Sequence, residues 1–194
     1  MNKILFFSNN KNKISEVNKL FKQFSINLIS LNDLGFSEAP KENGKTFAEN
    51  AKIKSLFGFK NFNIPCFADD SGICISALQN KPGVLSKNFI ESFSNNEECF
   101  EFIFKKVKNH KDNRAFFKTS ICFTSRLNHH VIFEGKINGK ISNKIAGKNG
   151  FGFDPIFIPQ GFSNTFGNMS AKSKNRVSHR SVAITKLISF LING

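Results

Sequence analysis

The spacing of apolar residues constrains the fold of this chain more than any other feature. Residues 3–8 hold a short apolar run, and the apolar positions after it recur at three- and four-residue steps: Ile14, Val17, Leu20, Phe21 and Phe24. A short apolar run indicates a buried strand, and the spacing that follows is that of one helix face. The chain is therefore predicted to open as strand, polar loop and helix.

Two capping boxes predict where later helices begin. Thr46 and Glu49 have the T-x-x-E spacing in which each side chain satisfies a backbone donor of the other residue, and this helix is expected to run to about Gly58. Ser94 and Glu97 have the same spacing ahead of a helix with the apolar face Phe100, Ile103, Phe104 and Val107. A last amphipathic helix is predicted from about Ser178, with its inward face formed by Val182, Ala183, Leu187 and Leu191.

Strands and turns are predicted between these helices. Residues 64–78 are expected to form two short strands interrupted by an acidic turn, Asp-Asp-Ser-Gly, at 69–72. Further strands are expected at 116–124 and 131–137. The dipeptide Asn138-Gly139 that follows them is the strongest short-range indication of a tight hairpin in the chain.

Length and composition favour one soluble domain over residues 1–194. The 194 residues and the 40% hydrophobic content suffice for one buried core, and neither repeats nor a low-complexity linker divides the chain. No stretch approaches the roughly 18 consecutive apolar residues of a membrane span. The four cysteines, Cys66, Cys74, Cys99 and Cys122, lack a C-x-x-C pair. We therefore expect a cytoplasmic protein without a membrane partner.

The formal net charge of +14 suggests nucleic acid as a partner, because lysines and arginines that neutralise phosphates supply most of non-specific binding. The lysines are scattered through every segment, however, and arginine occurs only at Arg114, Arg126, Arg176 and Arg180. Nucleic acid is therefore not the expected partner. A basic nucleic-acid-binding protein without catalysis nevertheless stays open as an alternative, and it predicts an affinity that falls steeply with salt.

Two polar segments are candidates for phosphate chemistry. The loop Ser8-Asn9-Asn10-Lys11-Asn12-Lys13 leaves a strand and enters a helix, where backbone N–H groups and the helix dipole favour anions. The segment 69–72 carries adjacent carboxylates, which suit a hard cation such as Mg²⁺ while one of them orients or deprotonates a water. The alternatives are a solvated helix cap for the first segment and a simple hairpin turn for the second.

Two further segments are candidates for nucleotide contacts. Gly150-Phe151-Gly152-Phe153-Asp154-Pro155 alternates small residues with aromatic rings, an arrangement that suits a flat base. Lys174 with Ser178-His179-Arg180 brings several donors near the start of the last helix. The alternatives are core phenylalanines and a structural histidine.

These segments, in this order, resemble the inosine triphosphate pyrophosphatase family, the Ham1-like pyrophosphatases of non-standard purine nucleoside triphosphates, over almost the whole chain. The resemblance is carried by Ser8-Asn9-Asn10 with Lys13 and Glu16, Thr46-Phe47-Ala48-Glu49-Asn50-Ala51 with Lys54, Ala68-Asp69-Asp70-Ser71-Gly72, Pro82-Gly83-Val84-Leu85-Ser86, residues 150–157 and Ser178-His179-Arg180. It implies an elongated α/β fold of two lobes around a mixed β-sheet with flanking helices, a nucleotide cleft between the lobes, and a homodimer.

The same resemblance implies hydrolysis of ITP, dITP or XTP to the monophosphate and pyrophosphate, with Mg²⁺ as cofactor. Asp70 matches the position of the proton acceptor and Mg²⁺ ligand. Expected substrate contacts are Ser8, Asn9, Asn10, Lys11, Asn12, Lys13, Lys54, Ser71, Phe151, Gly152, Phe153, Asp154, Lys174, His179 and Arg180. A related pyrophosphatase for other modified nucleotides stays open as an alternative.

The sequence departs from the family pattern at a few positions. Lys41 stands where a metal-binding glutamate is expected, and Glu42 or Glu38 is a possible replacement, of which Glu42 is the predicted second ligand. Lys87 and Asn88 follow Ser86 where alanine and arginine are usual, so an arginine is lost. We interpret these changes as tolerated in an active enzyme.

Overall fold

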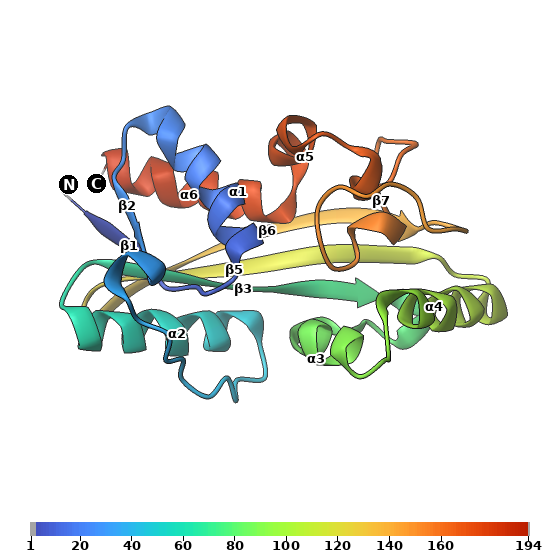
Figure 1. The fold of residues 1–194 in the computed structure, drawn as a ribbon, viewed down its shortest axis with the longest axis horizontal. Helices are drawn as coiled ribbons and strands as arrows, with labels where there is room; N and C mark the ends of the chain where they lie inside the picture. The colour runs from blue at the N-terminus through green and yellow to red at the C-terminus, as the bar shows by residue number, and fades with distance from the viewer. Residues whose placement is uncertain (1–2, 194) are drawn as a thin grey trace. The chain divides into compact units, whose positions relative to one another are not determined.

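The computed structural model describes residues 3–193 of the 194, and within them it shows an α/β fold around a seven-stranded mixed sheet (Figure 1). The strands are β1 (Ile4–Phe6), β2 (Leu28–Ser30), β3 (Cys66–Ile75), β4 (Lys81–Pro82), β5 (Arg114–Arg126), β6 (His129–Ile141) and β7 (Phe157–Pro159). The helices are α1 (Lys11–Phe21), α2 (Phe47–Phe62), α3 (Ser86–Glu91), α4 (Asn96–His110), α5 (Ala171–Val177) and α6 (His179–Asn193). The expected fold class is therefore confirmed.

The strand order is β2-β1-β3-β5-β6-β7, with β4 paired to β3. β1 pairs in parallel with β2 and with β3, whereas β4 and β7 pair antiparallel to β3 and β6. By its internal contacts the chain divides into two compact units, the first comprising residues up to Asp70, 119–135 and the chain from Arg180, and the second comprising 71–118 and 136–179. Each unit has a core of its own.

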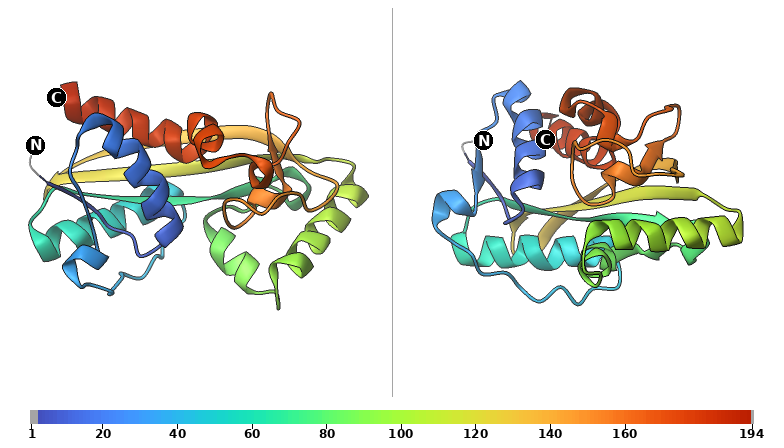
Figure 2. Two further views of the ribbon diagram at one scale, coloured as in Figure 1. Left: turned by 45° about the horizontal axis from the view of Figure 1, so that its top comes forward. Right: turned by 45° about the vertical axis from the view of Figure 1, so that its right-hand side comes forward.

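The first unit buries apolar residues on both faces of its strands, because neighbouring residues of β1 point to opposite sides. Ile4 and Phe6 join the core formed with α1 and α6, whereas Leu5 and Phe7 join a second core with Cys66 and Ala68 of β3. Figure 2 shows α1 and α6 on one side of these strands and α2 on the other. Each face is thus covered by helix.

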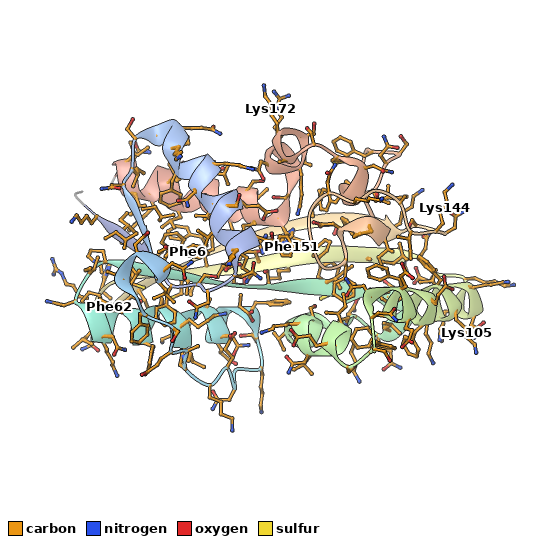
Figure 3. All side chains as sticks on the ribbon, in the orientation of Figure 1. Phe6, Phe62, Lys105, Lys144, Phe151 and Lys172 are labelled. Atoms are coloured by element: carbon orange, nitrogen blue, oxygen red, sulfur yellow. The ribbon has the colours of Figure 1, made fainter. Side chains whose placement is uncertain are left out.

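The second unit holds one apolar cluster, to which α4 contributes Phe100 and Ile103 and β3 contributes Ile73 and Ile75. Three of its lysines, Lys105, Lys144 and Lys172, are exposed, and Figure 3 shows them pointing away from the ribbon. The four cysteines of the chain are all buried and none forms a disulfide. In residues 3–193 no helix is long and apolar enough to cross a membrane.

The helix from Thr46 begins as predicted and ends later than predicted. The Thr46 side chain accepts a hydrogen bond from the Glu49 backbone, and the Glu49 carboxylate accepts one from the Thr46 backbone, which completes the capping box. The helix continues past Gly58 to Phe62 and stops at Asn63, which adopts the left-handed conformation. Gly58 is needed inside the helix because a Cβ there would lie 2.6 Å from both Cys66 Sγ and Phe7 Cδ2.

The start of α4 differs from the prediction by one residue. Asn95, not Ser94, caps the helix by accepting a hydrogen bond from the Glu98 backbone at 2.9 Å, and Glu98 in turn accepts one from the Ser94 backbone. Asparagine and serine are N-cap residues of similar strength, so cap preference does not distinguish Ser94 from Asn95 in the sequence. The predicted inward residues Phe100 and Ile103 are buried.

The acidic segment 69–72 is not a turn, and this prediction is corrected. β3 runs without interruption from Cys66 to Ile75, so the two carboxylates lie inside one long strand. Position 72 requires glycine because neighbouring atoms leave no room for a side chain: a Cβ there would lie 2.2 Å from the Gly83 carbonyl and 2.3 Å from Ser86 Oγ. Ser86 Oγ also accepts a hydrogen bond from the Ile73 backbone at 2.9 Å.

The predicted hairpin at Asn138-Gly139 is also wrong. β6 continues through both residues to Ile141, and neither adopts the positive φ that a tight hairpin of this type requires. Gly139 pairs with Pro159 of β7, and a Cβ on Gly139 would lie 2.3 Å from the Ile158 carbonyl. Pairing with a distant strand therefore overrides the local turn preference.

Candidate active site

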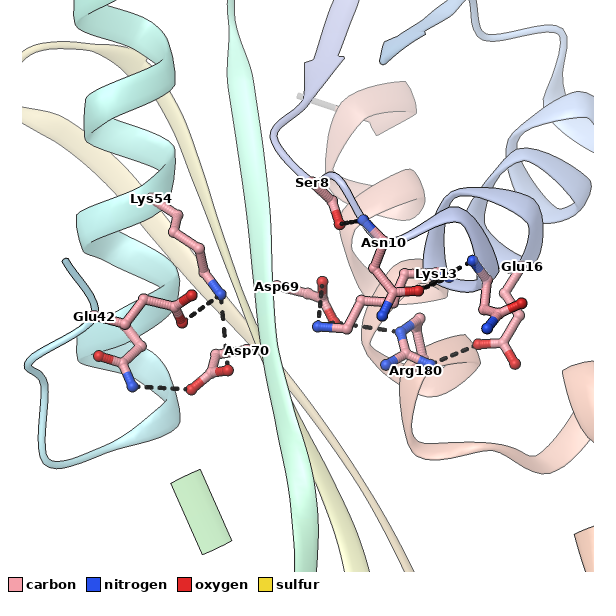
Figure 4. Close-up of polar contacts among 11 residues, drawn as sticks. Ser8, Asn10, Lys13, Glu16, Glu42, Lys54, Asp69, Asp70 and Arg180 are labelled. Carbon is pink, nitrogen blue, oxygen red and sulfur yellow. Dashed lines mark hydrogen bonds and ion pairs between the residues drawn. The ribbon is translucent and has the colours of Figure 1, made fainter. Parts of the chain in front are cut away.

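Asp69 and Asp70 are consecutive in β3, and their carboxylates lie on opposite faces of the strand. Asp69 contacts side chains of α1 and α6, whereas Asp70 contacts side chains of α2 (Figure 4). This follows from the alternation of side chains along a strand. The two carboxylates therefore do not form one pair, as the prediction of an acidic turn implied, but belong to two separate polar clusters.

The Asp70 cluster joins three elements of the first unit. Asp70 Oδ2 accepts a hydrogen bond from Asn50 Nδ2 at 3.1 Å, and Asp70 Oδ1 lies 3.7 Å from Lys54 Nζ. Lys54 Nζ also lies 2.7 Å from Glu42 Oε2. Asn50 and Lys54 are four residues apart in α2 and so share one helix face. The two predicted metal-binding residues, Asp70 and Glu42, are thereby connected through one lysine.

Burial controls the protonation of Asp70. Loss of solvent raises the pKa of its carboxyl above the ordinary value, and this effect exceeds the opposing influence of the Lys54 and Lys13 charges and of the Asn50 hydrogen bond. A carboxylate with a raised pKa binds a proton more readily than a surface aspartate. This is the property that a proton acceptor needs.

The Asp69 cluster is more deeply buried than the Asp70 cluster and consists only of ionisable side chains. Lys13 Nζ lies 3.1 Å from Asp69 Oδ1 and 3.0 Å from Oδ2, and Arg180 Nε lies 3.3 Å from Oδ2. Arg180 also binds Glu16 of α1 at 2.5 Å. Burial alone would raise the pKa of Asp69, but the charges of Lys13 and Arg180 hold it well below its usual range.

Lys13 and Arg180, both predicted substrate contacts, thus bind carboxylates of the protein itself. Burial lowers the pKa of Lys13, partly opposed by the charge of Asp69. The side chain of Lys13 is 16% exposed and that of Arg180 only 3%. Solvent therefore reaches Lys13 more than it reaches Arg180.

The predicted phosphate loop, residues 8–13, is held by its own side chains. Asn10 caps α1 by accepting hydrogen bonds from the Asn12 and Lys13 backbones at 3.0 and 3.1 Å, and Ser8 Oγ accepts one from the Asn10 backbone. Asn9 Nδ2 donates to the Ser37 carbonyl at 3.0 Å. Two of the backbone donors expected to meet an anion are thus already occupied by the Asn10 cap. Lys11 and Asn12 are exposed at the same helix end.

Three predicted residues of the second unit form a compact cluster. Lys174 Nζ lies 2.6 Å from Asp154 Oδ2 and 4.9 Å from the centre of the Phe151 ring. Asp154 Oδ2 also accepts a hydrogen bond from the Phe151 backbone at 2.8 Å. Gly150 is required here, because it has a φ of +77° and a Cβ on it would lie 2.0 Å from Asp154 Oδ2. The glycine-rich loop is thus folded around the Asp154 carboxylate.

Phe153 and His179, both predicted nucleotide contacts, occupy buried positions in the second unit. Phe153 is 4% exposed and its ring packs near Phe100 in the apolar cluster. The His179 ring is also 4% exposed and stacks on Phe117, with 4.6 Å between ring centres. In both cases the side chain packs within the unit. Gly152 and Ser71 are half-buried in the same unit.

The sequence motifs predict no role for Asn50 or Glu16, although Asn50 contacts Asp70 and Glu16 contacts Arg180. Asn50 is buried within α2 at 4% exposure. An asparagine in a helix interior is unfavourable unless its side chain has a partner. An asparagine inside the predicted helix was therefore the feature of the sequence that indicated a side-chain partner for Asn50.

Comparisons with known proteins agree over nearly the whole chain. The sequence pattern of the Ham1 family matches residues 4–190. A dITP/XTP pyrophosphatase of Christiangramia forsetii is 35% identical over 97% of this chain and 98% of its own. A dITP/XTP pyrophosphatase of Leptospira interrogans is 38% identical over 95% of this chain and 94% of its own.

Solved structures give the same result. A HAM1 protein from Coxiella burnetii has a TM-score of 0.89 at 31% identity and covers 100% of both chains. The Ham1 protein of Staphylococcus aureus has a TM-score of 0.84 at 33% identity and covers 98% of both chains. With its sequence pattern, its relatives and its fold in agreement, the chain belongs to the Ham1 family.

Proposed function

We propose that this protein hydrolyses non-standard purine nucleoside triphosphates, namely dITP, ITP and XTP, to the monophosphate and pyrophosphate, and so removes them from the nucleotide pool. The observation that carries the proposal is the buried Asp70 carboxylate, held by Asn50 and Lys54 in a chain whose relatives are dITP/XTP pyrophosphatases. Attack of water on the α-phosphorus needs a positioned base, and Asp70 is suited to that role.

In this proposal Asp70 accepts the proton of the attacking water. Its Oδ2 is held by Asn50, and the raised pKa favours proton uptake. Lys54 holds Glu42 and Asp70 with a positive charge, which also neutralises charge that develops on the phosphates. Each of these residues belongs to the first unit.

We propose Mg²⁺ as the cofactor, with Asp70 and Glu42 as its protein ligands. Among residues 3–193 no three His, Cys, Asp or Glu side chains are arranged to hold a metal ion by themselves. This donor set nevertheless fits Mg²⁺, which proteins usually bind through one or two carboxylates together with substrate phosphates and water. When bound, the ion would neutralise phosphate charge.

We propose that the polar groups at the start of α1, which are the half-buried Ser8 and the exposed residues 9–12, contact the triphosphate together with Lys13. Because the Asn10 cap already occupies two backbone donors, the lysine side chains carry this role. For the base we propose the Phe151, Asp154 and Lys174 cluster, where the lysine charge lies over an aromatic face. Gly152 and Ser71 are proposed as backbone or hydroxyl contacts, and His179 and Arg180 as support for these residues.

The test is turnover of dITP, ITP, XTP, GTP and ATP with and without Mg²⁺, with both products identified by ³¹P NMR. Selective release of IMP, dIMP or XMP with pyrophosphate is the expected result. Equal cleavage of GTP and ATP would contradict the substrate class, and release of inorganic phosphate in place of pyrophosphate would contradict the reaction.

We also propose that the protein works in the cytoplasm as a homodimer. Four buried cysteines without a disulfide are consistent with a reducing compartment. Light scattering coupled to size-exclusion chromatography tests the dimer, since a mass near 21.8 kDa would be that of the monomer.

A further inference from the structure

We propose that Asn50 is a positioning residue that fixes the Asp70 carboxylate and the Glu42 loop relative to each other. The inference rests on the proposed function and adds to it a residue that acts through Asp70. Its evidence is a chain of two hydrogen bonds, both ending on the Asn50 amide, in the first unit.

The first bond ties Asn50 to the loop that carries Glu42. The Gly44 backbone N–H donates to Asn50 Oδ1 at 2.8 Å. Gly44 suits this contact because it has no side chain: a Cβ there would lie 2.6 Å from Asn50 Oδ1 and 2.7 Å from Glu49 Cβ. The loop between residues 37 and 44 has no regular secondary structure, so such contacts determine its path.

The second bond follows from the first. A backbone N–H can only donate, so the oxygen of the Asn50 amide must face Gly44 and the NH₂ group must face Asp70. Asn50 Nδ2 accordingly donates to Asp70 Oδ2 at 3.1 Å. The orientation of the amide is thereby set by the loop, and the amide in turn presents a donor to one chosen oxygen of Asp70.

Asn50 and Lys54 make a two-point clamp on the same loop. Lys54 Nζ holds the Glu42 carboxylate at 2.7 Å, and Asn50 holds Gly44, two residues further on. Both side chains also contact Asp70, one at each of its oxygens. Asn50 differs from Lys54 in being neutral and 4% exposed, so it acts through geometry and not through charge.

The experiment compares Asn50→Leu with Asn61→Leu. Asn61 is an exposed asparagine of the same helix that bonds only within it, to the Phe57 carbonyl, so it is a matched control. We expect Asn50→Leu to lower kcat about 10–100-fold and to raise the Mg²⁺ concentration needed for half-maximal rate, as loss of a partner behind a metal ligand does. The KM for XTP should change little, and Asn61→Leu should match the wild type in every respect.

A second variant guards against simple loss of folding. Gly44→Ala leaves Asn50 in place but pushes a methyl group against its Oδ1, and we expect the same fall in kcat; Asn43→Ala, on the neighbouring exposed residue, is its control. Amide exchange at Gly44, measured by NMR without nucleotide, should accelerate in Asn50→Leu.

The results separate this inference from the function on which it rests. A folded Asn50→Leu variant with wild-type kcat and wild-type Mg²⁺ dependence would overturn the inference while leaving the proposed function intact. If the wild type cleaved none of the triphosphates, the proposed function would fall. Unchanged Gly44 exchange in Asn50→Leu would then reject the clamp as well.

Discussion

The carboxylates of Asp69 and Asp70, adjacent in sequence, lie on opposite faces of β3 and have their pKa values displaced in opposite directions. Asp69 is stabilised as an anion by two buried cations, whereas burial dominates at Asp70. One residue of spacing along a strand thus separates a carboxylate with a lowered pKa from one with a raised pKa. The same substitution at the two positions should therefore have different effects.

Asp70→Asn is expected to remove most turnover while the fold is kept. The amide is the same size as the carboxyl group but cannot accept the proton of the attacking water. The fall in kcat for XTP should be about 100-fold or more, the contribution of a positioned base. Steady-state kinetics and far-UV circular dichroism check the two halves of this prediction, and an unchanged kcat would remove Asp70 from the mechanism.

Asp69→Asn is expected to destabilise the protein, because it leaves Lys13 and Arg180 buried without their shared counter-charge. Removing one partner from a buried ion pair costs about 3–5 kcal/mol. Urea denaturation followed by circular dichroism measures the change. A variant as stable as the wild type at pH 7 would show that the cluster contributes no net stability.

The stability difference between wild type and Asp69→Asn should also depend on pH. Asp69 has a lower pKa in the fold than its ordinary value of 3.8. Its contribution is therefore complete above about that value and is lost as the pH falls through the lower, folded pKa. The urea midpoints of the two proteins should differ by a constant amount between neutral pH and about pH 4, and this difference should shrink as the pH is lowered below about 4. A difference that stays constant down to about pH 2 would exclude titration of Asp69 as the cause.

Lys174→Met should destabilise the protein more than the double change Lys174→Met with Asp154→Asn. The single change removes the Lys174 charge from the buried Asp154 carboxylate, at a cost of about 3–5 kcal/mol. The double change removes the charge of the carboxylate as well. The amide of asparagine can still accept the Phe151 backbone hydrogen bond. Thermal unfolding of the three proteins tests the order, and a double variant less stable than the single one would refute it.

Gly58→Ala should destabilise the protein, although the same change usually stabilises a helix by about 1 kcal/mol. The new methyl group would meet Cys66 Sγ and the Phe7 ring at 2.6 Å, and overpacking of this kind costs about 1–3 kcal/mol. The urea midpoint gives the sign directly. A stabilised variant would mean that α2 can move away from β3 at little cost.

Local patterns predicted the elements whose stability is local. The Thr46–Glu49 capping box and the helical spacing from Ile14 to Phe21 are both present, because helix contacts join residues close in sequence. The predicted hairpin at Asn138-Gly139 was wrong because Gly139 pairs with Pro159, twenty residues away, and the residues beside the dipeptide do not indicate this pairing. The continuity of β3 through residues 69–72 was missed for the same reason, since contacts with residues distant in sequence keep this segment extended.

The candidate site was predicted in part for the same reason. Asp70, Lys54 and Glu42 were found from motifs, and the structure brings them together. One partner of Arg180 is Glu16, separated from it by 164 positions, and no local pattern connects the two. Phe153 was predicted from the alternation of small and aromatic residues in its loop, and His179 from its cluster of donors with Arg180. Their burial is a result of packing that neither pattern contains.

The burial of all four thiols offers a way to observe the motions of each unit. The chain has no Trp and no Tyr, so intrinsic fluorescence cannot follow its unfolding. Cys66 and Cys122 lie in the first unit and Cys74 and Cys99 in the second, and burial raises the pKa of each thiol. Because the thiolate is the reactive form, alkylation requires local opening. The alkylation rate of each cysteine therefore reports how often the part of the molecule around that cysteine opens.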